Sequence, residues 1–364
     1  MKTLIVDDSI VFRSGITQAL SKEIDIDVYK AVSNGKIAVD FLKNQNDIDL
    51  ITLDMEMPIM NGLETIKEIR KFNKNVIIIV FSATTVRGAE ATIDALTHGA
   101  NDFVAKVEGA GSIEESIEMI RNELVPKIRA FSFQKGEKQR EVETVFEKTE
   151  RLDISHSPLS DVINVDTALG LIEKLPKMIL IGSSTGGPDA LLVILSKIKK
   201  PLEYPVFIVQ HMPPIFTKKL AEVLNIKSAL NVKEAENYEV AKAGYCYIAP
   251  GDYHMTVHEH KGEMVIKLNK DEKVCSVRPS VDVLFESCAN SFEGPFLSFV
   301  LTGMGRDGTS GSIALNRKKN YLFIQDKESS AVWGMGGSID KENIGAKALK
   351  LEDIGTLLSK LGNN

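Results

Sequence analysis

Short apolar runs alternate with stretches of helical periodicity along the first 125 or so residues of the chain. The apolar runs, which predict strands, lie at 4–6, 28–32, 50–53, 76–81 and 103–105. The helical patterns between and after them lie at 9–20, 37–42, 63–69, 90–96 and 113–128. Continuous β-branched runs between helices are typical of parallel strands that are buried on both faces. We therefore expect an α/β domain with a doubly wound parallel sheet over residues 1–128.

The pattern changes between the two halves of the chain. Residues 134–141 are charged and almost devoid of apolar side chains, and 155–160 are turn-like, so we interpret 129–175 as a charged linker. Apolar strand patterns then resume at 178–181, 206–209, 245–249 and 299–302, with helical patterns between several of them. A second doubly wound parallel-sheet α/β domain is therefore expected over residues 176–361.

Composition restricts the class of protein. Of the 364 residues, 43% are hydrophobic and 26% are charged, and the net charge of −6 disfavours a nucleic-acid binder that works by neutralising phosphates. The three cysteines are far apart and form no C-x-x-C, which favours reduced thiols in the core over disulfides or zinc. No apolar run approaches the roughly 18–20 residues that span a bilayer, and acidic residues come too early for a signal peptide. The sequence therefore predicts a cytoplasmic protein without membrane insertion.

Five polar side chains follow predicted strands of the first domain. They are Asp7, Asp8, Asp54, Ser82 and Lys106. Ligands of open parallel sheets bind where the strands end, so we expect these side chains to lie together. Three carboxylates that repel one another need a hard cation, and Mg²⁺ is the natural one. Asp54 can then act as a carboxylate nucleophile toward a phosphoryl group whose oxygens Ser82 and Lys106 bind.

The motifs that contain these residues resemble response-regulator receiver domains. They read Val-Asp-Asp-Ser at 6–9, Leu-Asp-Met-Glu-Met-Pro at 53–58, Asn-Gly-Leu at 61–63, Phe-Ser-Ala at 81–83 and Gly-Ala-Asn-Asp-Phe-Val-Ala-Lys at 99–106. The resemblance covers about residues 1–125 and implies a flavodoxin-like fold in which Asp54 accepts phosphate from a histidine kinase. It also implies that Phe103 is the aromatic residue that changes rotamer on activation. The implied Mg²⁺ ligands are Asp7, Asp8, Asp54 and the backbone carbonyl of Glu56.

A glycine- and serine-rich hexapeptide joins a strand pattern to a helix pattern at the start of the second domain. It reads Gly-Ser-Ser-Thr-Gly-Gly at 182–187 and contains G-x-S-x-G with Ser184 at its centre. Such an elbow holds a serine at the carboxyl edge of a sheet, beside a helix N-terminus that favours an anion. Because similar turns also cradle phosphate groups, these residues alone leave a nucleophile and a phosphate-binding turn both open.

A serine nucleophile needs a base and an acid that orients the base. His211 and Asp307 both follow strand patterns, which places them at the same sheet edge as Ser184. Taken by itself, each of these two residue types is more often structural at such a position, and their joint placement leaves a catalytic and a structural role both open. A second histidine group, His254, His258 and His260, would share one face of a strand, but its surroundings favour a plain hairpin strand over a metal site.

Five motifs of the second domain resemble the catalytic domain of chemotaxis protein-glutamate methylesterases. They are Ile-Gly-Ser-Ser-Thr-Gly-Gly-Pro at 181–188, Gln-His-Met-Pro-Pro-Ile-Phe-Thr at 210–217, Ala-Pro-Gly-Asp-Tyr-His-Met at 249–255, Arg-Pro-Ser-Val-Asp-Val-Leu-Phe at 278–285 and Leu-Thr-Gly-Met-Gly-Arg-Asp-Gly at 301–308. The resemblance implies an α/β serine-hydrolase-type domain in which Ser184 is the nucleophile, His211 the general base and acid, and Asp307 the orienting carboxylate. The backbone N–H groups near Thr185 and Met304 are candidate oxyanion donors.

The chain departs from these family patterns at two positions. Val107 stands where receiver domains usually have proline after the lysine, which argues against the usual cis peptide bond there. Gly336 stands in Gly-Met-Gly-Gly at 334–337, where the esterase family usually has proline, and this predicts a looser loop beside the cleft.

The two resemblances together predict a phosphorylation-activated serine hydrolase. It would release methanol from glutamate methyl esters on the cytoplasmic helices of chemoreceptors, deamidate certain receptor glutamines, and receive phosphate from a histidine kinase. Mg²⁺ would serve the receiver domain alone, and the esterase reaction would need no cofactor. The alternatives are a response regulator with a non-catalytic protein-interaction domain and a DNA-binding regulator. The latter is disfavoured because the second domain is acidic and has no helix-turn-helix pattern.

Overall fold

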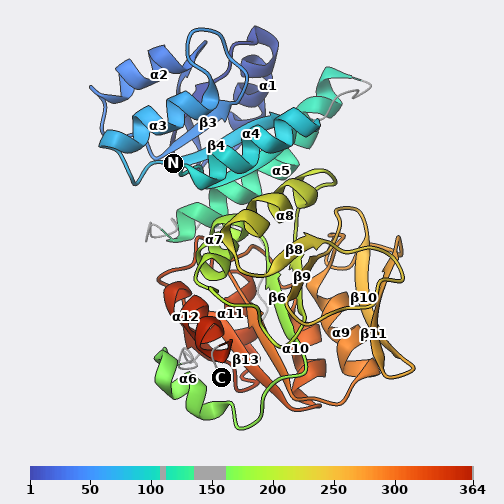
Figure 1. Ribbon diagram of the computed structural model, residues 1–364. Helices are drawn as coiled ribbons and strands as arrows, with labels where there is room; N and C mark the ends of the chain where they lie inside the picture. Colours follow the sequence, from blue (N-terminus) through green and yellow to red (C-terminus); the bar gives the residue numbers. More distant parts are fainter. Residues whose placement is uncertain (107–111, 135–160, 363–364) are drawn as a thin grey trace, which may run out of the picture.

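The computed structural model describes residues 1–106, 112–134 and 161–362 and arranges them in two α/β domains (Figure 1). The first domain contains β1 (Lys2–Val6), α1 (Ile10–Leu20), β2 (Asp27–Val32), α2 (Gly35–Leu42), β3 (Leu50–Asp54), α3 (Gly62–Phe72), β4 (Ile77–Ala83), α4 (Val86–Thr97), β5 (Asp102–Lys106) and α5 (Ile113–Gln134). Val107 and most of the predicted linker, including residues 135–160, lie outside the described residues.

The first sheet confirms the predicted fold. Its five strands lie in the order β2-β1-β3-β4-β5, and every neighbouring pair is parallel. Apolar side chains of α1 and α5, such as Ile16 and Leu124, pack on one face of the sheet, while α2, α3 and α4 cover the other. Because strands of a parallel sheet all point the same way, the side chains that follow β1, β3, β4 and β5 lie at one edge.

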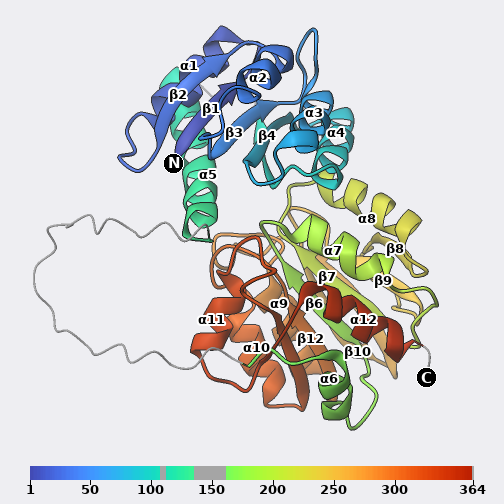
Figure 2. The ribbon, with the colours of Figure 1, turned by 90° about the vertical axis from the view of Figure 1, so that its left-hand side faces the viewer.

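Helix α5 is longer than the sequence pattern predicts. It continues past Ile128 to Gln134 and extends from the first domain toward the second (Figure 2). In its last turns, Phe131 is buried in a cluster that includes Val332 of the second domain. The helix therefore continues because its apolar face packs against a domain that lies far away in sequence.

The second domain is built on a larger parallel sheet. Its elements are α6 (Val165–Leu171), β6 (Ile179–Ser183), α7 (Gly187–Ser196), β7 (Val206–Gln210), α8 (Phe216–Lys227), β8 (Asn231–Glu234), β9 (Tyr245–Ile248), β10 (His254–His260), β11 (Glu263–Asn269), α9 (Val281–Ser291), β12 (Phe296–Val300), α10 (Thr309–Asn316), β13 (Asn320–Gln325), α11 (Met335–Lys341), β14 (Lys347–Leu349) and α12 (Leu351–Leu361). Seven strands form the order β14-β13-β12-β6-β7-β9-β8, all parallel, and β10 and β11 form a separate antiparallel hairpin.

The two faces of this sheet carry different helices. Apolar residues of α7, α8 and α12 pack on one face, and those of α9, α10 and α11 pack on the other. The doubly wound parallel sheet predicted for this domain is therefore confirmed. No helix in the described ranges is both long and apolar enough to cross a bilayer.

The first domain packs on the carboxyl edge of the second sheet. Helix α4 contacts α7 and α8, which begin just after β6 and β7, as Figure 1 shows. The ring of Phe103 on β5 stacks on that of Phe216 at the start of α8, with 4.8 Å between ring centroids. Val332, in the segment after β13, belongs to the same buried apolar cluster as Phe131 of α5. The first domain thus contacts three segments that leave the same sheet edge.

Candidate functional site

The acidic residues predicted in the first domain lie together. The carboxylate oxygens of Asp7, Asp8 and Asp54 are within 4.8 Å of one another, with Asp7 and Asp54 buried and Asp8 exposed. The Lys106 Nζ atom lies 2.8 Å from Asp54 Oδ1 and 3.4 Å from Asp7 Oδ2. The backbone N–H of Glu56 donates to Asp54 Oδ1 at 3.3 Å.

The electrostatics of this cluster favour a bound cation. Burial raises the pKa of Asp7 to about 6, against the opposing charge of Lys106, and burial also raises the pKa of Asp54. One lysine therefore does not compensate the buried negative charge. Three carboxylates with hard oxygen donors fit Mg²⁺, which keeps several waters and binds phosphoryl oxygens. The Glu56 carbonyl as a further ligand stays a prediction.

Ser82 lies at the expected edge, but its hydroxyl group is engaged elsewhere. The side chain is buried at the end of β4, and its Oγ donates a hydrogen bond to the carbonyl oxygen of Gly88 in α4 at 2.8 Å. A contact between Ser82 and a phosphoryl group at Asp54 would therefore exchange this bond for a new one. Such an exchange would connect the phosphorylation site to α4, the helix that packs on the second domain.

The hexapeptide at 182–187 forms a tight turn between β6 and α7. Gly186 has φ of 75°, and a Cβ atom on Gly182 would lie 2.5 Å from the side chain of Val281, so both positions need glycine. Ser183 is fully buried and donates to Gln210 Oε1 at 2.7 Å, whereas Ser184 is partly exposed. The surroundings of these adjacent serines therefore favour Ser184 as the reactive hydroxyl.

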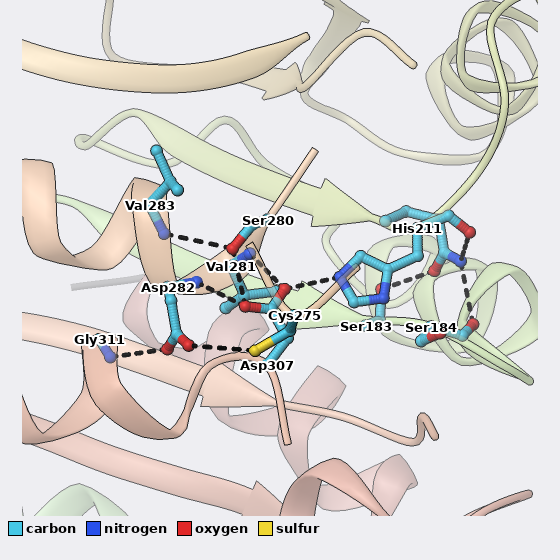
Figure 3. Close-up of polar contacts among 11 residues, drawn as sticks. Ser183, Ser184, His211, Cys275, Ser280, Val281, Asp282, Val283, Asp307 and Gly311 are labelled. Carbon is cyan, nitrogen blue, oxygen red and sulfur yellow. Dashed lines mark hydrogen bonds and ion pairs between the residues drawn. The ribbon is translucent and has the colours of Figure 1, made fainter. Parts of the chain in front are cut away.

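His211 and Asp307, which are 96 residues apart in sequence, form a direct contact at the same edge. His211 Nε2 lies 2.7 Å from Asp307 Oδ2, and the imidazole is located between Asp307 and Ser184 in Figure 3. An ionised carboxylate only accepts hydrogen bonds, so Nε2 carries the proton and Nδ1 holds the lone pair that faces away from Asp307. Within the described residues the Ser184 hydroxyl forms no hydrogen bond with His211.

The carboxylate of Asp307 is held by four donors. Besides His211, the Ser280 hydroxyl and the backbone N–H of Asp282 donate to Oδ1 at 2.7 and 3.0 Å, and the N–H of Val281 donates to Oδ2 at 2.7 Å (Figure 3). Burial alone would raise the pKa of Asp307, but His211 and the N–H groups at the start of α9 hold it below its usual value. Asp307 is therefore a fixed negative charge behind the histidine.

The two predicted oxyanion donors lie on adjacent loops. The N–H of Ser184 donates to the Thr302 carbonyl at 3.0 Å, and the Thr302 hydroxyl donates to the Thr185 carbonyl at 2.9 Å, so the loops are hydrogen-bonded together. In the part of the chain that the structure describes, the N–H groups of Thr185 and Met304 donate to no protein acceptor. Both are therefore free to donate to an oxyanion.

Comparison with known proteins places both domains in known families. The family model "Response regulator receiver domain" matches residues 3–118, and "CheB methylesterase" matches residues 179–358. The protein-glutamate methylesterase/protein-glutamine glutaminase of Trichodesmium erythraeum is 38% identical over 97% of this chain and 96% of its own length. The chain belongs to the protein-glutamate methylesterase/protein-glutamine glutaminase family. A relative of the same name from Bacillus licheniformis is 40% identical over 93% of this chain and 92% of its own length.

One solved structure covers the second domain of this methylesterase-family chain. The methylesterase catalytic domain of Thermotoga maritima is 39% identical, with a TM-score of 0.49, and the match covers 51% of this chain and 98% of that chain.

Sequence reasoning missed three residues that hold the site together. Ser280 and Asp282 surround Asp307, and Gln210 binds both Ser183 and, through its Nε2, the Ser184 carbonyl at 2.9 Å. The signal for the first two was present, since Ser280 stands directly before a helical pattern and caps α9 by accepting from Val283 N–H. Nothing in the local pattern indicates that this helix start would bind the Asp307 carboxylate.

The three histidines at 254, 258 and 260 and two of the three cysteines take structural positions. His254–His260 form the predicted hairpin strand β10, and the histidines are absent from the possible metal-binding groups found among the described residues. Cys246 and Cys288 are buried as expected. The expectation of a core thiol is wrong for Cys275, which is exposed and lies 3.9 Å from Asp282 Oδ2.

Gly336 lies in a packed helix and not in a loose loop. It belongs to the first turn of α11, where a Cβ atom would lie 2.8 Å from the Trp333 ring, and a Cβ on neighbouring Gly337 would lie 2.9 Å from it. The expectation of a looser loop therefore does not hold. The two glycines make room for an indole that packs beside the Gly303 segment.

Proposed function

We propose that this chain hydrolyses glutamate methyl esters on proteins with release of methanol, and glutamine side chains with release of ammonia. The relatives named above carry both activities in their names. The observation that carries the proposal is the Asp307-bound imidazole of His211 at the sheet edge of Ser184. This arrangement also supports a catalytic second domain over the non-catalytic alternative.

The reaction follows from the hydrogen-bond directions. His211 Nδ1 takes the proton from Ser184 as Oγ attacks the ester carbonyl, and Asp307 stabilises the imidazolium. The N–H groups of Thr185 and Met304 bind the oxyanion. When the tetrahedral intermediate collapses, His211 returns the proton to the leaving methoxide, and methanol departs from a glutamyl ester of Ser184. Water, activated by the same histidine, then hydrolyses that ester and restores the serine.

Methanol release from a methyl-esterified protein substrate tests this mechanism. Ser184→Ala should lose turnover, because it removes the hydroxyl that attacks the ester carbonyl in this mechanism. Ser183→Ala is a matched control that should keep turnover, since Ser183 is buried against Gln210. Substantial activity in Ser184→Ala would refute the serine assignment.

We also propose that phosphorylation of Asp54 activates the enzyme. Helix α4, Phe103 and the α5 extension contact α7, Phe216 and Val332, which border the catalytic edge. Val332 accepts a hydrogen bond from Gly303 N–H at 3.0 Å, one residue before the oxyanion candidate Met304. Asp7, Asp8 and Asp54 would hold Mg²⁺, which when bound neutralises phosphoryl oxygens, while Lys106 binds one of them. Loss of these contacts would open the edge to substrate.

The regulation is tested by measuring esterase rates with Mg²⁺, with and without a small acyl-phosphate donor. The donor should raise the rate of the parent chain but not that of Asp54→Asn. Trp333, the single tryptophan of the chain, follows Val332, so its fluorescence should change together with the rate. Equal rates with and without the donor would contradict the proposal.

The partners in this proposal are a histidine kinase as phosphate source and chemoreceptor cytoplasmic helices as substrate. The cytoplasm is the compartment in which both would be accessible. Phosphotransfer from an isolated kinase, followed by methanol release from a methylated receptor fragment, tests both partners in one assay.

A further inference from the structure

The carboxylates of Asp282 and Asp307 each accept hydrogen bonds from a helix N-terminus next to the other residue. The carboxylate of Asp307, just before α10, accepts hydrogen bonds from the N-terminal N–H groups of α9, those of Val281 and Asp282. In return, the carboxylate of Asp282, in the first turn of α9, accepts the N–H of Gly311 in the first turn of α10 at 2.7 Å. Figure 3 shows the hydrogen bonds to both carboxylates. We refer to this arrangement as the reciprocal cap.

The reciprocal cap restrains the position of Asp307. Helix α10 begins two residues after Asp307, so any movement of its first turn passes directly to the carboxylate. There is little room for such movement, because a Cβ on Gly311 would lie 2.5 Å from the side chain of Phe285 in α9. Loss of the Asp282 carboxylate would leave the buried Gly311 N–H without its acceptor, at a site where Asp307 has only 2% of its surface exposed.

The cap also concentrates charge behind the histidine. The carboxylates of Asp282 and Asp307 have oxygens within 4.8 Å of each other, in a group that includes the Cys275 thiol. Asp282 itself is buried and makes no salt bridge with a lysine or arginine among the described residues. A second negative charge beside Asp307 stabilises an imidazolium on His211 in addition to the effect of Asp307.

We propose that Asp282 is a positioning residue for the reaction at Ser184: it holds Asp307 through the reciprocal cap and adds a second negative charge that stabilises protonated His211. The inference rests on the proposed serine-hydrolase function. Asp282 touches neither Ser184 nor His211 through any described hydrogen bond, so it acts through Asp307.

The groups that face Asp282 determine its response to pH. They are Asp307 before α10, Cys275 in the segment before α9, and Glu286 one turn further along α9, with Arg306 close to Cys275. Burial, together with the charge of Asp307, raises the pKa of Asp282 to about 6. Asp282 is therefore charged at pH 8 and takes up a proton as the pH falls through 6.

The test uses the full chain and the variant Asp282→Asn. The asparagine oxygen can still accept the Gly311 N–H, so the variant removes the charge and keeps the acceptor. We expect kcat/KM on the pH plateau to fall roughly 10-fold, and the acid limb to move to lower pH by about half a unit to one unit and become less steep. Glu286→Gln removes an exposed charge from the same helix, and because solvent screens this charge the variant should shift the profile much less than Asp282→Asn does.

A second measurement separates this inference from the proposed function. The rate at which a fluorophosphonate probe labels Ser184 depends on the same base but needs no ester substrate, and it should follow the same pH shift in Asp282→Asn. If the parent chain labels but releases no methanol, the esterase proposal fails while this inference is still tested. If Asp282→Asn melts like the parent and matches its labelling rate and pH profile, Asp282 is not a positioning residue.

Discussion

The two domains both have buried aspartates at the carboxyl edges of similar parallel sheets. They differ in how far neighbouring donors compensate the negative charge of these aspartates. In the receiver, Asp7 and Asp54 share one lysine, and burial raises the pKa of both. In the catalytic domain, Asp307 is equally buried but accepts four hydrogen bonds, and its pKa lies below the usual value.

The difference shows how one kind of edge serves two kinds of chemistry. A site that must take up a cation and a phosphoryl group needs negative charge that the protein has left uncompensated. A site that must hold an imidazolium during a reaction needs a charge that is already fully bound and cannot move or accept a proton. The number of N–H and O–H donors around each carboxylate makes the distinction.

Replacement of the bound charge should have the largest effect. Asp307→Asn replaces one carboxylate oxygen by an NH₂ group, although both oxygens are acceptors: Oδ2 accepts from His211 and Val281, and Oδ1 accepts from Ser280 and Asp282. An NH₂ group at the Oδ2 position leaves the imidazole without the acceptor that fixes its tautomer and orientation. We expect kcat for methanol release to fall by about 10³–10⁴-fold.

The matched change in the receiver tests the other half of the comparison. Asp54→Asn should abolish phosphorylation but leave the basal rate of methanol release nearly unchanged. A similar loss of basal rate in both variants would mean that the two edges are not functionally distinct.

Addition of Mg²⁺ should stabilise the uncompensated site alone. A cation that binds the folded receiver raises its thermal midpoint by a few degrees at about ten times its dissociation constant. Thermal unfolding of the parent chain at pH 8 should show this shift, and Asp8→Asn should reduce it because one oxygen ligand is lost. Asp307→Asn is the control and should respond to Mg²⁺ as the parent does. An undiminished shift in Asp8→Asn would exclude Asp8 as a ligand.

Asp189 extends the comparison to a carboxyl group that accepts no hydrogen bond from the residues that the structure describes, and we expect the smallest effect there. It lies in the first turn of α7, and burial raises its pKa to about 7. The folded state therefore binds this proton more tightly than the unfolded state, and stability is lost as the pH rises from about 4 to 7.

Asp189→Asn should remove this pH-dependent loss of folding stability, because asparagine does not ionise. Its thermal midpoint should match the parent near pH 4 and exceed it by about 2–4 °C at pH 8. A variant that is less stable than the parent at pH 8 would indicate that the ionised Asp189 has a favourable partner in solution.

The local pattern was enough to predict most of the receiver and its site. Strand-end positions such as Asp54 and Lys106 converge in any parallel sheet, because every strand delivers its last residue to the same edge. The pattern did not predict the full length of α5, because Phe131 lies in a segment that was interpreted as a charged linker. Its burial depends on a cluster that includes Val332, which is distant in sequence. The pattern also failed for Gly336, whose role depends on the Trp333 ring.

In the catalytic site, too, the sequence predicted some features and not others. Motif and strand order predicted Ser184, His211 and Asp307 as a group, and their roles as nucleophile, base and acid stay predictions until the variants are measured. The reciprocal cap was not predictable, because Asp282 and Gly311 lie on two helices and neither has a local feature that selects the other.

The amino-acid pattern alone determined two parallel sheets and the chemistry at the end of each strand, since apolar periodicity and side-chain type are local properties. Only the tertiary structure decided how each buried carboxylate is compensated and which surfaces of the two domains meet. Those outcomes depend on donors and apolar side chains that are distant in sequence, such as the pair His211 and Asp307, 96 residues apart. Burial makes such contacts decisive, because a charge removed from water is governed by its few nearest neighbours.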